Sequence, residues 1–153
     1  MIQYKDGGLR NVWLANGYEV RQTRFGEAVA IHDQEGLTKA VCLALTRKHS
    51  HLTGVEFRFV RSAGMLASQA ALGHHLGVDA QSVARWEKSG KVPRWADKLV
   101  RLLYAAHADG NVPIRRAMER TNQVERLANQ KIIIQESNKG WESTIEDCDE
   151  LPA

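Results

Sequence analysis

The segment from Leu66 to Pro93 constrains the fold more than any other part of the chain, because two short helical patterns in it flank a glycine turn. The first pattern covers Ser68–Leu76, and the serine hydroxyl is suited to cap its first turn. Gly77 permits a sharp bend that a side chain would obstruct, and Asp79 follows as the N-cap of a second helix. The second pattern ends near Gly90, since glycine supplies the left-handed conformation that terminates helices. The segment therefore predicts two helices that meet at a tight turn.

Helical geometry separates an inner from an outer face on the second helix, which should cover residues 80–88. Val83 and Trp86 are apolar and should pack inward on the first helix. The residues that then point outward are Ala80, Gln81, Ala84 and Arg85. Glutamine pairs bidentately with adenine and arginine with guanine, and each such pair discriminates by about 1–3 kcal/mol in the major groove. We therefore expect this face to read base pairs of double-stranded DNA.

A second set of residues is suited to contact phosphates. Hydroxyl, amide and cationic side chains position a protein on a duplex without reading its sequence, and a helix N-terminus assists them. The expected phosphate contacts are Ser68, Gln69, Ser82, Lys88, Lys91 and Arg94.

The same segment resembles the phage-repressor family of helix-turn-helix domains, the Cro-like or XRE type. The residues that carry the resemblance are Ser68-Gln69, Ala71-Leu72, Leu76-Gly77-Val78, Val83, Trp86-Glu87, Gly90 and Pro93. It covers roughly Thr53 to His107, about a third of the chain. The resemblance implies phosphate contact by Gln69, base reading by the outward residues of the second helix, and a buried Trp86. It also implies that Glu87 pairs with an arginine of the first helix of the domain, which begins near Thr53.

Two positions depart from the pattern of that family. Arg61 lies eight residues before Gln69, one more than is usual, so that an Arg61–Glu87 pair is only a hypothesis. Gly73 stands where the family commonly has a longer side chain, and it should weaken its helix by up to about 1 kcal/mol relative to alanine.

The opening residues 4–18, YKDGGLRNVWLANGY, are similar to relatives of the MqsA-like antitoxins. Those antitoxins bind zinc through paired CxxC motifs, which this chain lacks, since its two cysteines are Cys42 and Cys148. The histidines cluster only in short pairs, whereas structural zinc requires four ligands. We therefore expect no metal site and no cofactor, and we expect Cys42 to be a core thiol.

Three sections are expected along the chain. In residues 1–50, the segments Val12–Ala15 and Tyr18–Arg21 flank Asn16-Gly17, which is the preferred sequence of a two-residue hairpin turn. A third strand at Ala28–Ile31 and a helix at Glu35–Lys48 should complete this section.

The central section, residues 51–108, should be the helix-turn-helix domain. Thr53 and Glu56 form a capping box that opens a helix through about Ala63. Apolar residues at helical spacing continue after Pro93 and predict a further helix that includes Tyr104.

The last section, residues 109–153, should contain a helix at Pro113–Gln130, a β-prone run at Lys131–Gln135 with a turn at Asn138–Gly140, and an acidic tail. The predicted fold class is thus mainly α, with an α+β character. It consists of a four- to five-helix repressor-like domain, a small N-terminal hairpin and helix, and a C-terminal helix with a second small hairpin.

Charge is distributed unevenly. Residues 53–101 carry eight Lys or Arg against four acids, giving +4, and residues 136–153 carry one lysine against six acids, giving −5. A basic centre fits a polyanion-binding domain. No run of about 18 apolar residues and no signal-like N-terminus occurs, so that a cytoplasmic, nucleoid-associated protein without membrane contact is expected.

These patterns favour a sequence-specific DNA-binding transcriptional regulator, a repressor that binds a palindromic operator as a homodimer. One recognition helix reads few base pairs, and two copies on adjacent half-sites read enough. The alternative is an antitoxin that binds a protein toxin and regulates its own operon. No arrangement of nucleophile, base and acid occurs and no phosphate-binding loop is present, so we do not expect an enzyme.

Overall fold

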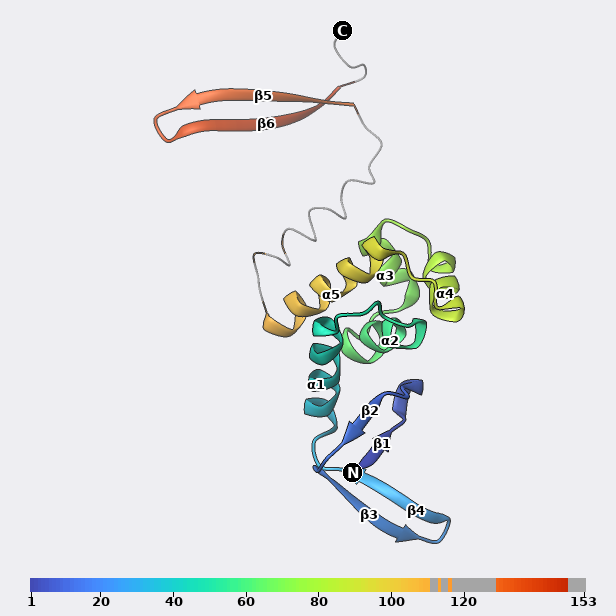
Figure 1. The fold of residues 1–153 in the computed structure, drawn as a ribbon. Coiled ribbons are helices and arrows are strands. Elements are labelled where there is room, and N and C mark those ends of the chain that lie inside the picture. Colours follow the sequence, from blue (N-terminus) through green and yellow to red (C-terminus); the bar gives the residue numbers. More distant parts are fainter. Residues whose placement is uncertain (111–112, 114–115, 117–128, 149–153) are drawn as a thin grey trace.

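The computed structural model describes residues 1–110, 113, 116 and 129–148. Within these residues the chain has a mixed α+β architecture with five α-helices and three antiparallel strand pairs (Figure 1). The helix predicted at Pro113–Gln130 falls mostly outside the described residues, and its last residue instead belongs to a strand. The acidic tail beyond Cys148 also lies outside them.

The N-terminal strands pair differently from the sequence-based prediction. Strand β1 (Ile2–Tyr4) pairs with β2 (Val12–Leu14), and β3 (Tyr18–Thr23) pairs with β4 (Gly26–Ile31). The hairpin predicted around Asn16-Gly17 is therefore wrong. Such a turn needs positive φ at both central residues, and Gly17 has φ +82° whereas Asn16 has no positive φ.

A short 3-10 turn, Asp6–Gly8, joins β1 to β2 and packs against the helices. Gly7 has φ +70°, and a Cβ atom added there would lie 2.6 Å from Cδ2 of Phe59. Leu9, directly after the turn, is buried. Only glycine allows the backbone to approach this ring so closely, which places β1 and β2 against the helical core.

Helix α1 (Gln34–Arg47) follows β4, and the Asp33 side chain caps it by accepting from the Gly36 N–H at 2.9 Å. Cys42 on its inner face is fully buried, and burial raises the pKa of its thiol to about 11. A thiol of this kind stays protonated and unreactive at neutral pH. The prediction of a core thiol is thereby confirmed.

Helix α2 (Gly54–Phe59) begins with the predicted capping box, in which Thr53 and Glu56 satisfy each other's backbone N–H groups. It does not end at Phe59, because a π-helical turn (Val60–Gly64) extends it. In this turn the Met65 N–H bonds to the carbonyl of Val60, five residues earlier. A π-turn accommodates one more residue than an α-turn.

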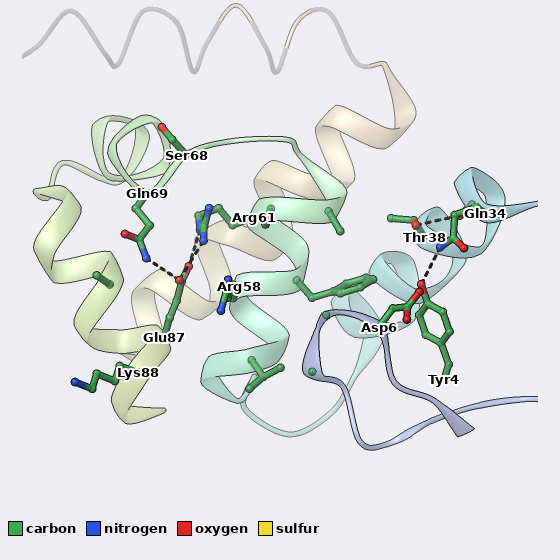
Figure 2. A pocket seen from close by; sticks show the side chains of 17 residues that line it. Tyr4, Asp6, Gln34, Thr38, Arg58, Arg61, Ser68, Gln69, Glu87 and Lys88 are labelled. Carbon is green, nitrogen blue, oxygen red and sulfur yellow. Dashed lines mark hydrogen bonds and ion pairs between the residues drawn. The ribbon is translucent and has the colours of Figure 1, made fainter. Parts of the chain in front are cut away.

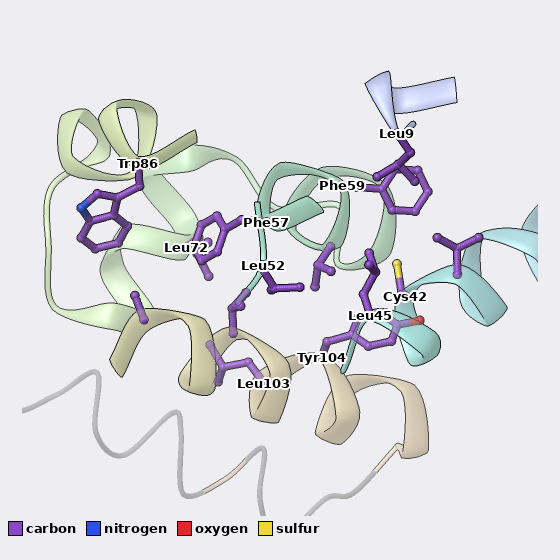
Figure 3. Close-up of a cluster of buried hydrophobic side chains, with 14 of the residues drawn as sticks. Leu9, Cys42, Leu45, Leu52, Phe57, Phe59, Leu72, Trp86, Leu103 and Tyr104 are labelled. Carbon is purple, nitrogen blue, oxygen red and sulfur yellow. The ribbon is translucent and has the colours of Figure 1, made fainter. Parts of the chain in front are cut away.

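Three further helices complete the helical body: α3 (Gln69–Leu76), α4 (Ala80–Ser89) and α5 (Arg94–Asp109). A single cluster of buried side chains joins the N-terminal strands to these helices (Figure 3). Its members include Tyr4, Leu9, Leu14, Cys42, Leu45, Phe57, Phe59, Leu72, Val83, Trp86, Leu103 and Tyr104.

Two buried carboxylates hold the loop between α1 and α2. Glu56 binds the Lys48 ammonium at 2.6 Å, and Asp97 accepts from the backbone N–H of Leu52 at 2.8 Å. Arg101 binds Asp97 at 2.5 Å and donates to backbone carbonyls of the same loop. The loop is thus fixed to α5 by charge-assisted hydrogen bonds, which are stronger than neutral ones.

The C-terminal hairpin predicted at Asn138–Gly140 is confirmed. Strands β5 (Asn129–Ser137) and β6 (Gly140–Cys148) pair over their whole length, and Ser137 lies opposite Gly140. The hairpin is longer than the predicted β-prone run. None of the hairpin side chains that the structure describes belongs to the buried core of the helical body.

Candidate nucleic-acid interface

Helices α3 and α4 are joined by a tight turn whose local chemistry follows the sequence. The Ser68 hydroxyl caps α3 by accepting from the Ala71 N–H at 3.0 Å, and Asp79 caps α4 by accepting from Ser82 N at 2.7 Å. Gly77 and Gly90 end the two helices with φ of +73° and +75°. Each predicted cap and stop in this segment is present.

Gly73 has a structural role that the sequence did not reveal. It is buried, and a Cβ atom at this position would lie 2.6 Å from the carbonyl oxygen of Val78. The Val78 N–H also bonds to the Gly73 carbonyl at 2.9 Å. Glycine therefore lets the turn fold directly against α3.

Helix α4 has the two faces that the sequence predicted. Val83 is fully buried and Trp86 is nearly so, with its ring edge-to-face on both Phe57 and Trp95. On the outer face Gln81 and Arg85 are exposed. Ala80 and Ala84, also predicted to read bases, are half-buried on the same helix. The Arg85 guanidinium donates a long hydrogen bond to Ser82 Oγ, at 3.4 Å, and lies near the Asp79 carboxylate, while the side chain stays exposed to solvent.

A buried ionic network fixes α4 relative to α2. Arg61 Nε and Nη2 donate to the two carboxylate oxygens of Glu87 at 2.5 and 3.1 Å, and Nη1 donates to the Ala67 carbonyl at 2.8 Å. The two side chains are 9% and 6% exposed. The hypothesis of an Arg61–Glu87 pair is thereby confirmed, and the π-turn that follows α2 accommodates the long spacing to Gln69.

Gln69, predicted to contact phosphate, takes part in this network. Its Nε2 donates to Glu87 Oε2 at 3.0 Å, and the residue is half-buried. An amide NH₂ carries two N–H groups and its carbonyl accepts as well. One donor is thus engaged inside the protein, and phosphate contact by the other stays a prediction.

A groove of about 1080 Å³ brings several predicted residues together beside α4 (Figure 2). Ser68, Gln69, Ala84 and Lys88 line it on one side, and the 3-10 turn of the N-terminal strands lines it on the other. The groove does not include Ser82, which is half-buried, or the exposed Lys91 and Arg94.

Arg58 and Ser62 also line the groove and were missed by the sequence reasoning. Arg58 is exposed on α2, one turn before Arg61. Its spacing of three residues from Arg61 was the signal that was available, because residues three apart lie on neighbouring parts of a helix surface. Together with Lys88 it places two cationic side chains at the rim of the groove.

Asp79 lies at the start of α4, next to the expected base-reading residues. Hydrogen bonds from the hydroxyl and the N–H of Ser82 lower the pKa of this carboxyl, and the nearby Arg85 charge lowers it further. Asp79 is therefore ionised at neutral pH. Its negative charge interacts favourably with the positive N-terminal end of α4.

The described part of the chain contains no group of three or more His, Cys, Asp and Glu side chains that could hold a metal ion. Of its helices, none combines the length and the apolar character needed to cross a lipid bilayer. His51 contacts a carboxylate, since its Nδ1 lies 3.6 Å from a carboxylate oxygen of Asp97.

Comparison with known proteins adds no assignment. No family model matches the chain, and neither the curated proteins nor the solved structures contain a match to it.

Proposed function

We propose that this chain is a sequence-specific, double-stranded DNA-binding transcriptional regulator of the helix-turn-helix type. In this proposal α4 lies in the major groove, and the protein acts in the cytoplasm as a repressor, with two copies on a palindromic operator. The observation that carries the proposal is the position of Gln81 and Arg85, which are exposed on the face of α4 opposite the buried Val83 and Trp86. Such side chains read base edges when a helix enters the groove.

The rigid placement of α4 supports this function. Specific base readout needs side chains that are held at a fixed distance from the DNA backbone. The Arg61–Glu87 pair and the Gln69 hydrogen bond tie α4 to α2 and to the first turn of α3. The helix that would read bases and the helix end that would contact phosphate are thus linked directly by side-chain contacts.

The charges around α4 support it as well. Lys88, Lys91 and Arg94 are exposed at its end and beyond it, and Arg58 lies across the groove. Cations in these positions can bind phosphates of a DNA backbone that passes the N-terminus of α3, where backbone N–H groups favour an anion.

The proposal is tested by selection from random duplex DNA, followed by affinity measurements on the selected site at two salt concentrations. Arg85→Ala should lower the affinity for that site by about 1–3 kcal/mol and relax the preference at one base position. Arg24→Ala, at an exposed arginine in the β3–β4 turn, serves as the matched control and should leave base preference unchanged. Discrimination that survives Arg85→Ala would reject the reading role. Failure of every duplex to bind would reject the function.

An antitoxin that binds a protein toxin and represses its own operon is the second candidate. The observation that favours it is the exposure of apolar side chains on the β3–β4 pair, where Val20 and Val29 are 50% and 49% exposed and Phe25 is 96% exposed. Exposed apolar residues of this kind mark protein-binding surfaces when they form a patch. Co-expression should then recover a small toxic partner, and loss of that partner on Phe25→Ser would assign the surface.

A further inference from the structure

The C-terminal hairpin has one apolar and one polar face. Side chains alternate between the faces of a strand, and the register places Ile132 opposite Ile145, Ile134 opposite Ser143 and Glu136 opposite Trp141 on the same face. The apolar residues of this face are Ile132, Ile134, Trp141 and Ile145. The other face carries mainly charged and polar side chains, which are Lys131, Gln135, Glu142, Thr144 and Glu146 around Ile133.

The apolar face is not covered by any part of the chain that the structure describes. Ile132 is 65% exposed, Ile134 57%, Trp141 72% and Ile145 59%. A two-stranded hairpin is marginally stable at best when no other layer packs on it. The strong sidedness of these strands therefore indicates that the apolar face becomes buried.

We propose that this face packs against the same face of a second copy of the chain and so forms the dimer interface. The choice of occupant rests on the proposed function, because a short recognition helix needs a second copy to specify an operator. Two hairpins stacked in this way form a two-layer β-sandwich, with about 10 Å between the layers. Each apolar side chain then lies in a shared core.

The size of the face agrees with a modest dimer. A large aromatic residue buries about 150–250 Å² when it is fully covered. At their observed exposures, Trp141 and the three isoleucines together present on the order of 500 Å² per copy. The total of roughly 1,000 Å² lies at the lower limit of specific interfaces. Interfaces at this lower limit are typical of weak, transient complexes, so we expect a dissociation constant of about 10 micromolar. We also expect the dimer to bind an operator more tightly than a single copy does.

Acidic residues lie at the two ends of the face. Glu136 flanks Trp141 at the turn end, and Asp147 accepts a hydrogen bond from Gln130 at the open end, at 3.1 Å. In a stack of two copies these carboxylates remain at the rim, where like charges repel each other weakly through solvent. Raising the salt concentration should therefore strengthen the dimer, whereas it weakens binding to a basic partner.

The first experiment compares Ile145→Lys with Thr144→Lys in the full chain, by sedimentation equilibrium. The two substitutions introduce the same charge at neighbouring positions on opposite faces of β6. The unaltered chain and Thr144→Lys should dimerise alike, and Ile145→Lys should raise the dissociation constant at least tenfold. A chain that stays monomeric at 100 micromolar, which is roughly ten times the expected constant, would overturn the proposal. An equal effect of both lysines would overturn it as well.

A second measurement avoids a charge in the interface. In a Cys148→Ser background, Ser143→Cys places a thiol in the apolar face and Thr144→Cys places one in the polar face. Cys42 is fully buried and should not interfere. Maleimide should label Cys at position 143 at least fivefold more slowly at high protein concentration than after dilution, and label position 144 equally at both. Protection of position 143 at all concentrations would show that the chain covers the face itself. Absence of protection would show that no copy packs there.

A duplex that carries a single half-site separates this proposal from the proposed function. Ile145→Lys leaves α4 unchanged and should bind the half-site as the unaltered chain does, while losing at least tenfold on the full operator. Dimerisation without binding to any duplex would refute DNA recognition and leave the interface standing. If the chain bound the half-site but never dimerised, the proposed interface would be refuted and DNA recognition would stand.

Discussion

At the scale of single residues, Glu87 determines how α2, α3 and α4 are held together. Its carboxylate accepts from the guanidinium of Arg61 and from the amide of Gln69, and it is almost fully buried. Two N–H groups of one guanidinium and one neutral amide N–H thus converge on a single carboxylate. Removing a single partner leaves a buried charge uncompensated, which costs far more than an exposed ion pair contributes.

Glu87→Gln should therefore lower the free energy of unfolding by about 3–5 kcal/mol, because Arg61 loses its counter-ion. Urea denaturation at pH 7 measures the change. Glu27→Gln is the matched control, since Glu27 is exposed on β4 and should shift stability by no more than about 0.5 kcal/mol. A similar effect of both substitutions would contradict the role given to the network.

At the scale of elements, Gly73 shows two opposing effects in one helix. Alanine is favoured over glycine inside a helix by about 1 kcal/mol. The turn after α3, however, places the Val78 carbonyl where a side chain on residue 73 would lie. Steric exclusion by backbone cannot relax as a flexible side chain can, so packing outweighs helix propensity here.

Gly73→Ala should destabilise the fold by about 1–3 kcal/mol, as overpacking of a rigid site does. Thermal and urea unfolding both report it. Ala70→Gly, at an exposed position of the same helix, calibrates the propensity effect and should cost about 1 kcal/mol. If Gly73→Ala stabilised the protein, the close approach of the turn would be refuted.

The helix caps and stops are predictable from the sequence, whereas the hairpin predicted from the Asn16-Gly17 turn signal does not form. The caps Ser68 and Asp79 and the stop at Gly90 depend only on neighbouring residues, and each is present. The pairing of β1 with β2 was not predictable in this way, because Ile2 and Leu14 meet only when both strands pack on the helices. The π-turn after α2 likewise depends on a contact between residues far apart in the sequence, because it contains Arg61, which pairs with Glu87.

The candidate site was predictable to a similar degree. Helical periodicity alone separates the exposed Gln81 and Arg85 from the buried Val83. The three-residue spacing indicates that Arg58 shares a helix surface with Arg61, but the position of that surface beside α4 depends on how the two helices pack.

At the scale of the whole molecule, two buried carboxylates link stability to pH. Burial alone would raise the pKa of Glu56, but hydrogen bonds from Lys48, from the Thr53 N–H and from Asn11 outweigh it, so that the pKa is lowered. Burial would also raise the pKa of Asp97, but the hydrogen bonds from Arg101 and from the Leu52 N–H outweigh it, so that this pKa is lowered as well. The unfolded chain therefore binds more protons than the folded one in acid.

The urea concentration at the midpoint of unfolding should stay constant at pH values above the ordinary carboxyl pKa of about 4. It should fall as the pH drops from there through the lowered pKa values of the folded state. Glu56→Gln should be less stable at pH 7, since Lys48 loses its partner, and should show a shallower fall in acid. Equilibrium unfolding at pH 7, 4 and 3 measures both effects. A variant with the same acid slope as the unaltered chain would show that Glu56 does not contribute to this dependence.

The seating of Gly7 against Phe59 has a practical consequence for dissecting the molecule. Tyr4, Leu9 and Leu14 belong to the same buried cluster as the side chains of α2 and α5. A fragment that starts at Thr53 would lose these strands together with α1, and apolar side chains of the remaining helices, Phe59 among them, would become exposed to water. The first strands thus cover apolar side chains of the helices. A shortened protein for separate study of α4 must keep these strands, or must replace the apolar side chains that they cover with polar ones.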